Sequence, residues 1–523
     1  MLGALPVVAD FSRRLRLREI VDASCPMREV STVEVTHGQV IEALVANRLT
    51  SPAPLLHVRD WATAWAVPEV FGVPADALND DRVGRALDAL ADHLDHLVGS
   101  VGAAAIDAFG LDVTRMHWDM TSISLHGTYA EAEEGLPLPR FGHPKDRRPD
   151  LKQIQTGIAV SGDGGVPVFH QAFDGGAGEV SQVIPAMQAL QALAGPARLL
   201  MIGDSKLISY PNLAAMDRAG VTFIAPASKQ YVPAEVLAAQ QLSDTVEVDY
   251  VAARDAGKGP DQRGRWHVRD DVMTLPGPRK RDPVLTLRRV FVHSSARAQA
   301  AATARAKKLD RARDDLDRLT RGLGSRHYPD QAAVTARVQA IARDRRVGAY
   351  LRIHISTDEH GKPTLTWTFD QTAIDADAAG DGWYALLSNL DPTEADAAEI
   401  LRRYKGQEAV ERRYQAFKGP LAVAPLFVKN NRRIAAMITV ICLALLIFCL
   451  VERAVRRAIA PAEKLDGLYA GRPAKPTSRL IFEALQHLRI IPGHGNNPHV
   501  IPQPPPLPAQ LLNLLNVDPL QPT

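Results

Sequence analysis

Carboxylates stand at two unusual places in the first half of the sequence. Asp119 lies inside the alternating segment VTRMHWDMTSISL (113–125), where a charge among apolar neighbours is costly unless it is paired or bound to a metal ion. Asp204 ends the apolar run ARLLMIGD (197–204), and open sheets place their ligand sites at the carboxyl ends of such strands. Either residue alone is as easily a cap or a turn residue.

A third carboxylate, Glu411, lies in the segment YKGQEAVERRYQAFK (404–418), within a long helix expected to begin near Thr393. Polar residues follow here in steps of three, four and seven, so a helix of 3.6 residues per turn puts them on one face. These residues are Tyr404, Gln407, Glu411 and Lys418. A solvated polar stripe is the alternative interpretation.

The surroundings of Glu411 are strongly basic. Between residues 402 and 433 nine basic residues stand against two acidic ones, a local net charge of +7. An acid on a basic surface is typical of a groove for a polyanion that also holds a metal ligand. We therefore expect this segment, including Arg412 and Arg413, to line a path for DNA.

Other catalytic patterns are missing from the sequence. It contains no P-loop, no G-x-G-x-x-G, no G-x-S-x-G and no H-E-x-x-H. Its three cysteines, Cys25, Cys442 and Cys449, can form neither a disulfide framework nor a paired C-x-x-C zinc site. A reducing compartment fits this usage.

Composition indicates a folded protein of several parts. The chain has 523 residues, of which 46% are hydrophobic and 23% charged, with a formal net charge of +2. At roughly 150 residues per domain this length suggests about three structural units. A global polycation is excluded, so a polyanion would have to meet a local basic patch.

Residues 1–105 read as a helical domain, because apolar residues recur at helical spacing in 38–49, 56–65 and 82–101. The segment Leu78-Asn79-Asp80-Asp81 offers capping side chains just ahead of the third of these helices. Such a domain could be a DNA-binding arm or a generic helical packing unit.

Residues 106–230 have the pattern of a mixed α/β sheet. Strands are expected at 113–125, 154–162 and 165–173, with a glycine-rich hairpin turn between the last two. The order continues with a helix at 179–195, a strand at 197–204, a short helix, and a strand at 221–227. This order predicts a ribonuclease-H-like sheet, although a doubly wound sheet has a similar order from 179 onward.

The remaining segments are expected to interrupt and then complete this core. Residues 231–380, with a polar stretch at 250–282 and helices broken near Gly322, are expected to form an insertion domain. Residues 381–460 would return to the core and carry the helix of Glu411. Residues 461–523 would be a tail whose PQPPPLP segment is extended.

One apolar run, Ile434–Val451, is eighteen residues long and uncharged. It is long enough for a membrane span, which would make the chain a membrane-anchored protein. A helix buried on all sides of a large core is the interpretation we favour.

Taken in order, these motifs resemble the DDE-type transposases of bacterial insertion sequences that share a Y-(2)-R-(3)-E-(6)-K signature. The branch named for insertion sequence sixteen thirty-four is the most similar. The signature falls on Tyr404, Gln407, Glu411 and Lys418, with Gln407 where the family has Arg. The two aspartate motifs correspond to HWDMTS and LLMIGDSKL, and GHPKDRRPDLKQI, DGWYALLSN, LGALPVVADF and ALNDDRVGRALD are also similar to family segments.

The resemblance implies a ribonuclease-H-like core with an insertion between the second aspartate and the glutamate, which here are 207 residues apart. It implies cleavage and strand transfer of DNA with two Mg²⁺ or Mn²⁺ ions. Asp119 would bridge both ions, and Asp204 and Glu411 would each hold one. Lys418 would contact a phosphate, and Tyr404 would help to position DNA.

The partners implied are transposon ends and target DNA, bound by a homodimer without a membrane, in the bacterial cytoplasm. Two other functions remain open from the residues: a catalytically inactive DNA-binding relative, and a nuclease that uses the same carboxylates.

Overall fold

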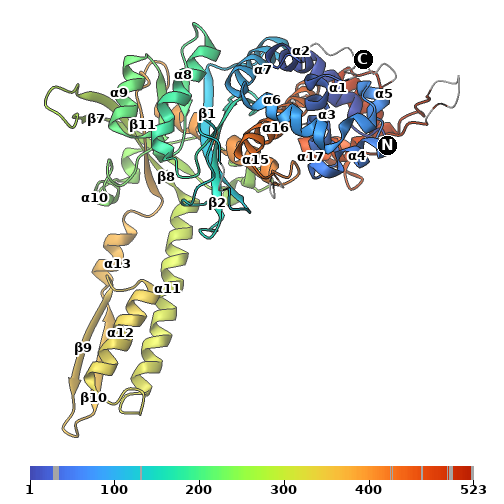
Figure 1. Ribbon diagram of the computed structural model, residues 1–523. Helices are drawn as coiled ribbons and strands as arrows, with labels where there is room; N and C mark the ends of the chain where they lie inside the picture. Colours follow the sequence, from blue (N-terminus) through green and yellow to red (C-terminus); the bar gives the residue numbers. More distant parts are fainter. Residues whose placement is uncertain are drawn as a thin grey trace. The chain divides into compact units, whose positions relative to one another are not determined.

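A computed structural model describes residues 1–27, 35–129, 132–423, 426, 428–460, 463–491, 493 and 499–519. The chain divides into two units (Figure 1). Unit 1 contains Met1–Thr222 and Lys405–Thr523, and unit 2 contains Phe223–Tyr404. Unit 1 therefore joins the first and last parts of the chain, and it contains both aspartates and Glu411.

Unit 1 begins with a set of helices. They are α1 (Leu5–Arg14), α2 (Leu17–Ser24), α3 (His37–Thr50), α4 (Val58–Ala64), α5 (Val67–Phe71), α6 (Asp80–Ala91) and α7 (Leu94–Phe109). Asn79 caps α6 as predicted, since its side chain accepts a hydrogen bond from the Arg82 N–H. The helix expected over 82–101 is two helices, because the chain turns between Ala91 and Leu94.

The apolar run predicted as a core helix lies in α16 (Asn431–Ala458). By length and hydropathy this helix could cross a membrane, yet its most apolar 18-residue window is entirely buried within the protein. It packs against α1, α3, α6, α7, β3, α15, α17 and α18. The structure thus agrees with the core interpretation of this segment.

The strands of unit 1 form a mixed sheet. They are β1 (Arg115–Leu125), β2 (Lys152–Ser161), β3 (Pro167–Phe173) and β4 (Leu200–Ile202), in the order β3-β2-β1-β4. β2 is antiparallel to β1 and β3, whereas β4 is parallel to β1. The helices α8 (Val183–Ala194) and α9 (Tyr210–Arg218) flank β4 in sequence. The predicted mixed α/β architecture is confirmed.

Unit 2 contains a second set of strands in the order β5-β11-β8-β7-β6. Their bounds are Thr222–Pro226 for β5, Val246–Glu247 for β6, Trp266–Leu275 for β7, Leu285–Ser294 for β8 and Trp383–Ser388 for β11. The short helix α10 (Ala234–Ala238) follows β5. β7 and β8 lie within residues 231–380, the expected insertion domain, and share this sheet with β11.

The rest of that segment forms a helical arm of unit 2, seen in yellow in Figure 1. It consists of α11 (Ser295–Arg321), α12 (Gln331–Arg345), β9 (Leu351–Thr357), β10 (Pro363–Phe369) and α13 (Gln371–Ala378). The break expected near Gly322 falls between α11 and α12. The arm has a hydrophobic core of its own, with Leu316, Val338 and Tyr350 among its buried residues.

The C-terminal segments differ most from expectation. The single long helix is two, α14 (Ala397–Lys405) and α15 (Glu408–Lys418). The expected tail contains β12 (Leu465–Tyr469), β13 (Arg472–Ala474), α17 (Ser478–Leu485) and α18 (Pro506–Leu515). Proline is well suited to the first turn of a helix, so the Pro-rich stretch starts α18, which buries Leu511, Leu512 and Leu515.

Short 3-10 turns complete the described elements. They lie at Leu55–His57, Ala75–Leu78, Glu179–Gln182 (η3), Ser205–Leu207 (η4), Leu242–Asp244, Ala253–Asp255 and Pro260–Gln262.

Candidate active site

The parallel pairing of β1 and β4 brings Asp119 and Asp204 to the same level of the sheet. The register joins Arg115 to Leu200 and His117 to Ile202, and two further residues along each chain reach the two aspartates. The backbones stay close beyond β4, since a Cβ added at Gly203 would lie 3.4 Å from the Trp118 carbonyl oxygen. Two residues that are far apart in sequence are therefore neighbours at the end of a buried strand.

The carboxylates of this pair are difficult to ionise. Burial raises the pKa of Asp119 to about 6, and the nearby charges of Asp204 and Glu179 act in the same direction. Burial also raises the pKa of Asp204, again with a contribution from Glu179. The Met120 N–H donates to Asp119 at 2.8 Å, and the Lys206 N–H donates to Asp204 at 2.9 Å. Crowded, partly desolvated carboxylates are stabilised by a bound cation.

Two residues beside the pair, Lys145 and Glu179, were not among the predicted site residues. The Lys145 ammonium lies 3.5 Å from Asp119 Oδ1 and 3.5 Å from Glu179 Oε1. Glu179 opens the turn η3, directly before α8. In the sequence, the one indication that Lys145 could belong to the site is its place in GHPKDRRPDLKQI, which is similar to a segment of the transposase family. Glu179 had none, because a glutamate at the start of a helix is ordinary.

Helix α15 is fixed against β1 near Asp119. The Gln407 side chain contacts two consecutive residues of β1: its Oε1 lies 3.1 Å from His117 Nδ1, and its Nε2 donates to the Trp118 carbonyl at 3.1 Å. Further along α15, the hydroxyl of the buried Tyr414 donates to the Asp119 carbonyl at 2.6 Å. These contacts occupy the Gln407 amide and anchor the start of α15 to β1.

Glu411 lies between these two contacts along α15, but it is exposed. Its carboxylate has neither a hydrogen bond nor an ion pair with another residue that the structure describes. Across the described parts of the chain, no three His, Cys, Asp or Glu side chains form a group that could hold a metal ion. The aspartate pair is thus present, whereas the predicted three-carboxylate site is not assembled. The donors that are present, carboxylate oxygens, fit a hard divalent cation.

Lys418, at the end of α15, lies on the same side as the aspartates. Burial lowers the pKa of its ammonium, and so does the charge of Lys145, whereas Asp146 and Asp119 oppose this shift. Two lysines therefore approach the carboxylates from different segments, which suits a ligand that carries several negative charges.

Tyr404 does not share the helix face of Glu411. It lies on α14 in unit 2, whereas Glu411 lies on α15 in unit 1. The helix breaks at Gly406-Gln407, because glycine is among the poorest helix formers. The single helix that the common face requires is therefore interrupted between Tyr404 and the other residues: Gln407 is the N-cap of α15, and Glu411 and Lys418 lie on it.

Arg412 and Arg413 have different environments. Arg412 is exposed and pairs with Glu408, one turn earlier, at 3.2 Å. Arg413 is buried, and its guanidinium donates to the carbonyls of Gly165 and Gly164 at 2.8 and 2.7 Å and lies 3.5 Å from Glu452. The environment of Arg413 does not favour the expected contact with DNA, because only 9% of its side chain is exposed and its guanidinium is engaged within the protein.

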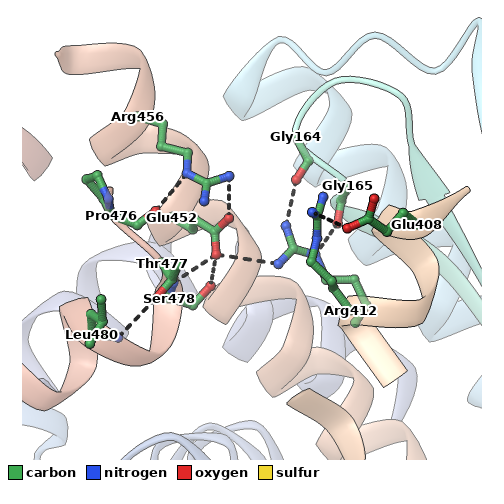
Figure 2. A network of polar contacts seen from close by, with 11 residues as sticks. Gly164, Gly165, Glu408, Arg412, Glu452, Arg456, Pro476, Thr477, Ser478 and Leu480 are labelled. Carbon is green, nitrogen blue, oxygen red and sulfur yellow. Dashed lines mark hydrogen bonds and ion pairs between the residues drawn. The ribbon is translucent and has the colours of Figure 1, made fainter. Parts of the chain in front are cut away.

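Glu452 of α16 is the centre of the network that holds Arg413 (Figure 2). Its carboxylate accepts from the Ser478 N–H and hydroxyl at 2.8 and 2.7 Å and pairs with Arg456 at 2.7 Å. Burial alone would raise the pKa of Glu452, but Arg413 and Arg456 hold it below its ordinary value. This network ties α15, α16 and α17 to the β2–β3 hairpin.

Comparisons with known proteins were made for the whole chain. Residues 1–98 match a family described as a domain of unknown function, DUF4277. No curated protein matches the sequence.

Among solved structures, the chain is similar to the piggyBac transposase in a synaptic complex with hairpin DNA. The TM-score is 0.35 and the identity 9%, over 92% of this chain and 78% of that one. It is also similar to the Mos1 transposase in a paired-end complex with the left transposon end, with a TM-score of 0.16 and 10% identity, over 40% of this chain and 64% of that one. Both of these solved structures are of transposases.

Proposed function

We propose that this chain is a transposase of the DDE type that cleaves DNA at the ends of an insertion sequence and joins the ends to a target. The observation that carries the proposal is the register that sets Asp119 beside Asp204 at the end of β4. The order β3-β2-β1-β4, with only β2 antiparallel to its neighbours, is the order expected of a ribonuclease-H-like core.

In this proposal Asp119 and Asp204 hold Mg²⁺ or Mn²⁺, and Glu411 is the third ligand. Bound divalent cations would activate the attacking oxygen and stabilise the leaving oxygen of an in-line displacement at phosphorus. The chain's own contribution is orientation. The hydrogen bonds of Gln407 and Tyr414 hold α15 along β1. Glu411 lies within one helical turn of Tyr414, whose hydroxyl donates to the Asp119 carbonyl.

Cationic side chains around the pair would bind the phosphates. Lys418 lies on the side of Asp119, and Arg412 is exposed on the same helix. Phosphate contacts of this kind position DNA without reading its sequence. We propose that two copies act together on a pair of transposon ends in the cytoplasm.

A cleavage and strand-transfer assay tests the proposal. The substrate is linear DNA that carries the inverted repeats flanking the coding sequence, with supercoiled plasmid as the target. Mg²⁺ or Mn²⁺ should support both steps, and Ca²⁺ should support them poorly because it prefers longer, looser coordination. Asp204→Asn should stop both steps while DNA binding remains. Hydrolysis without joined products would point to a nuclease, and cleavage in excess EDTA would refute the proposal.

A further inference from the structure

The carboxylate site already contains a cation of the protein itself. The Lys145 ammonium lies 3.5 Å from both Asp119 Oδ1 and Glu179 Oε1, and it also donates to the Met120 carbonyl. The two carboxylates are mostly buried, with about a fifth of each side chain exposed, at 20% and 22%. An ammonium so placed neutralises charges that burial would otherwise make costly.

The loop that carries Lys145 is attached to β1. The Lys145 backbone N–H donates to Ser122 Oγ at 2.9 Å, and the neighbouring Asp146 accepts from Ser124 Oγ at 2.5 Å. These anchors are two residues apart on β1, on the strand that carries Asp119. The position of the ammonium therefore follows from the fold of the loop as well as from attraction between charges.

We propose that Lys145 is a positioning residue that acts as an internal counter-cation: it holds Asp119 and Glu179 in the metal-free protein and must leave Asp119 when a divalent cation binds. This inference rests on the proposed function, because it assumes that Asp119 is a metal ligand. It adds that Lys145 sets the affinity of the site for metal.

The physical reason is competition for one carboxylate. A divalent cation and an ammonium that contact the same oxygen repel each other strongly where water is partly excluded. Binding of the metal must therefore include the cost of moving Lys145 away.

The test measures metal binding apart from catalysis. The full-length protein is titrated with Mn²⁺ at low ionic strength, and free Mn²⁺ is followed by electron paramagnetic resonance. Lys145→Met keeps the apolar stem and removes the charge, so it should bind Mn²⁺ about tenfold more tightly than wild type. Its melting temperature in EDTA should fall, because Asp119 and Glu179 then lack their counter-ion. Lys145→Arg should keep the wild-type affinity to within about twofold, because it keeps the charge.

Lys464→Met is the matched control, since it removes the same charge from an exposed position before β12. It should change neither Mn²⁺ affinity nor melting temperature. If Lys145→Met does not fold, Lys145→Gln provides the same neutralisation with a side chain that can still donate to the Met120 carbonyl. Equal affinities in wild type and the neutral variant would overturn the inference.

Asp119→Asn separates a wrong role for Lys145 from a wrong proposed function. If the affinities are equal but Asp119→Asn still abolishes Mn²⁺ binding and cleavage, only the role of Lys145 is wrong. If Asp119→Asn leaves both Mn²⁺ binding and cleavage intact, the proposed function is wrong as well.

Discussion

The two flanks of α15 each carry a charged side chain, but the environments of these two side chains differ. On one flank Arg413 is buried and satisfied by two carbonyls and by Glu452, which is itself satisfied by Ser478 and Arg456. On the other flank Glu411 is exposed and has no described partner. The difference teaches that a charge with all its partners inside the fold serves stability, whereas a charge without them is available to a ligand.

Loss of cleavage should be the largest effect, and it should be confined to the open flank. Alanine at Asp119, Asp204 or Glu411 should reduce cleavage by more than about 100-fold, since even the outer-shell partners of metal ligands are worth up to that factor. The free energy of unfolding should change little for Glu411→Ala. Single-turnover cleavage and urea unfolding measure the two quantities. A Glu411→Ala protein with near-normal cleavage would remove this residue from the site.

Loss of stability should be the next largest effect, and it belongs to the closed flank. Arg413→Met removes one of the two arginines that pair with the buried Glu452 and leaves the Gly164 and Gly165 carbonyls without this donor, which should cost about 1–3 kcal/mol of unfolding free energy. Arg412→Met, one residue away, should stay within about 0.5 kcal/mol, as exposed substitutions usually do. Urea unfolding of the two variants in parallel provides the measurement. Equal stability would mean that burial and partners do not separate these arginines.

The dependence of stability on pH should differ in sign between the flanks. The pKa of Asp119 is raised to about 6 in the fold, so its contribution to stability is present below the unfolded value and is lost as pH rises from about 4 to about 6. The pKa of Glu452 is lowered, so its contribution is present above the unfolded value and is lost as pH falls through the folded one. Urea unfolding in EDTA across pH 3–7, with Asp119→Asn and Glu452→Gln, should show each slope disappear in its own variant.

The smallest effect concerns Arg412. If it contacts one phosphate, Arg412→Gln should reduce the steepness of log K against log salt concentration by about 0.9. Fluorescence anisotropy with DNA at several salt concentrations measures this slope. Lys464→Gln serves as the control for loss of one charge, and an unchanged slope in Arg412→Gln would restrict Arg412 to its pair with Glu408.

The pairing of Asp119 with Asp204 could be anticipated because both signals are local. A charge within an alternating strand and a charge at the end of an apolar run each mark a position on the sheet, and parallel pairing then brings the two together. The environment of Arg413 could not be anticipated. Its partners lie on the β2–β3 hairpin and on α16, and nothing in the sequence ERR distinguishes an arginine that turns inward from its exposed neighbour.

Strands β7 and β8 show why part of the fold was missed. Their facing residues include Asp271 with Arg289, whose side chains pair at 2.7 Å. Cross-strand ion pairs place charged residues within the strands, where they obscure the alternating apolar pattern that predicts a strand. The segment therefore resembles a polar loop in sequence. Helix α18 was missed for a related reason: the prolines that precede and start it have the composition of an extended segment.

Helix α16 has a consequence for how the chain is synthesised. Helices α1, α3, α6 and α7 and strand β3 pack on a segment that the ribosome produces more than 250 residues later than β3. Until α16 is synthesised, the surfaces that it covers stay exposed. Contacts between segments so far apart in sequence also slow folding. When α16 does emerge, it is an apolar stretch of the length that a membrane insertion machinery accepts. Burial of α16 within the protein therefore requires that the helices and the strand that contact it have already folded. Truncated products that end before Ala458 should be prone to aggregate.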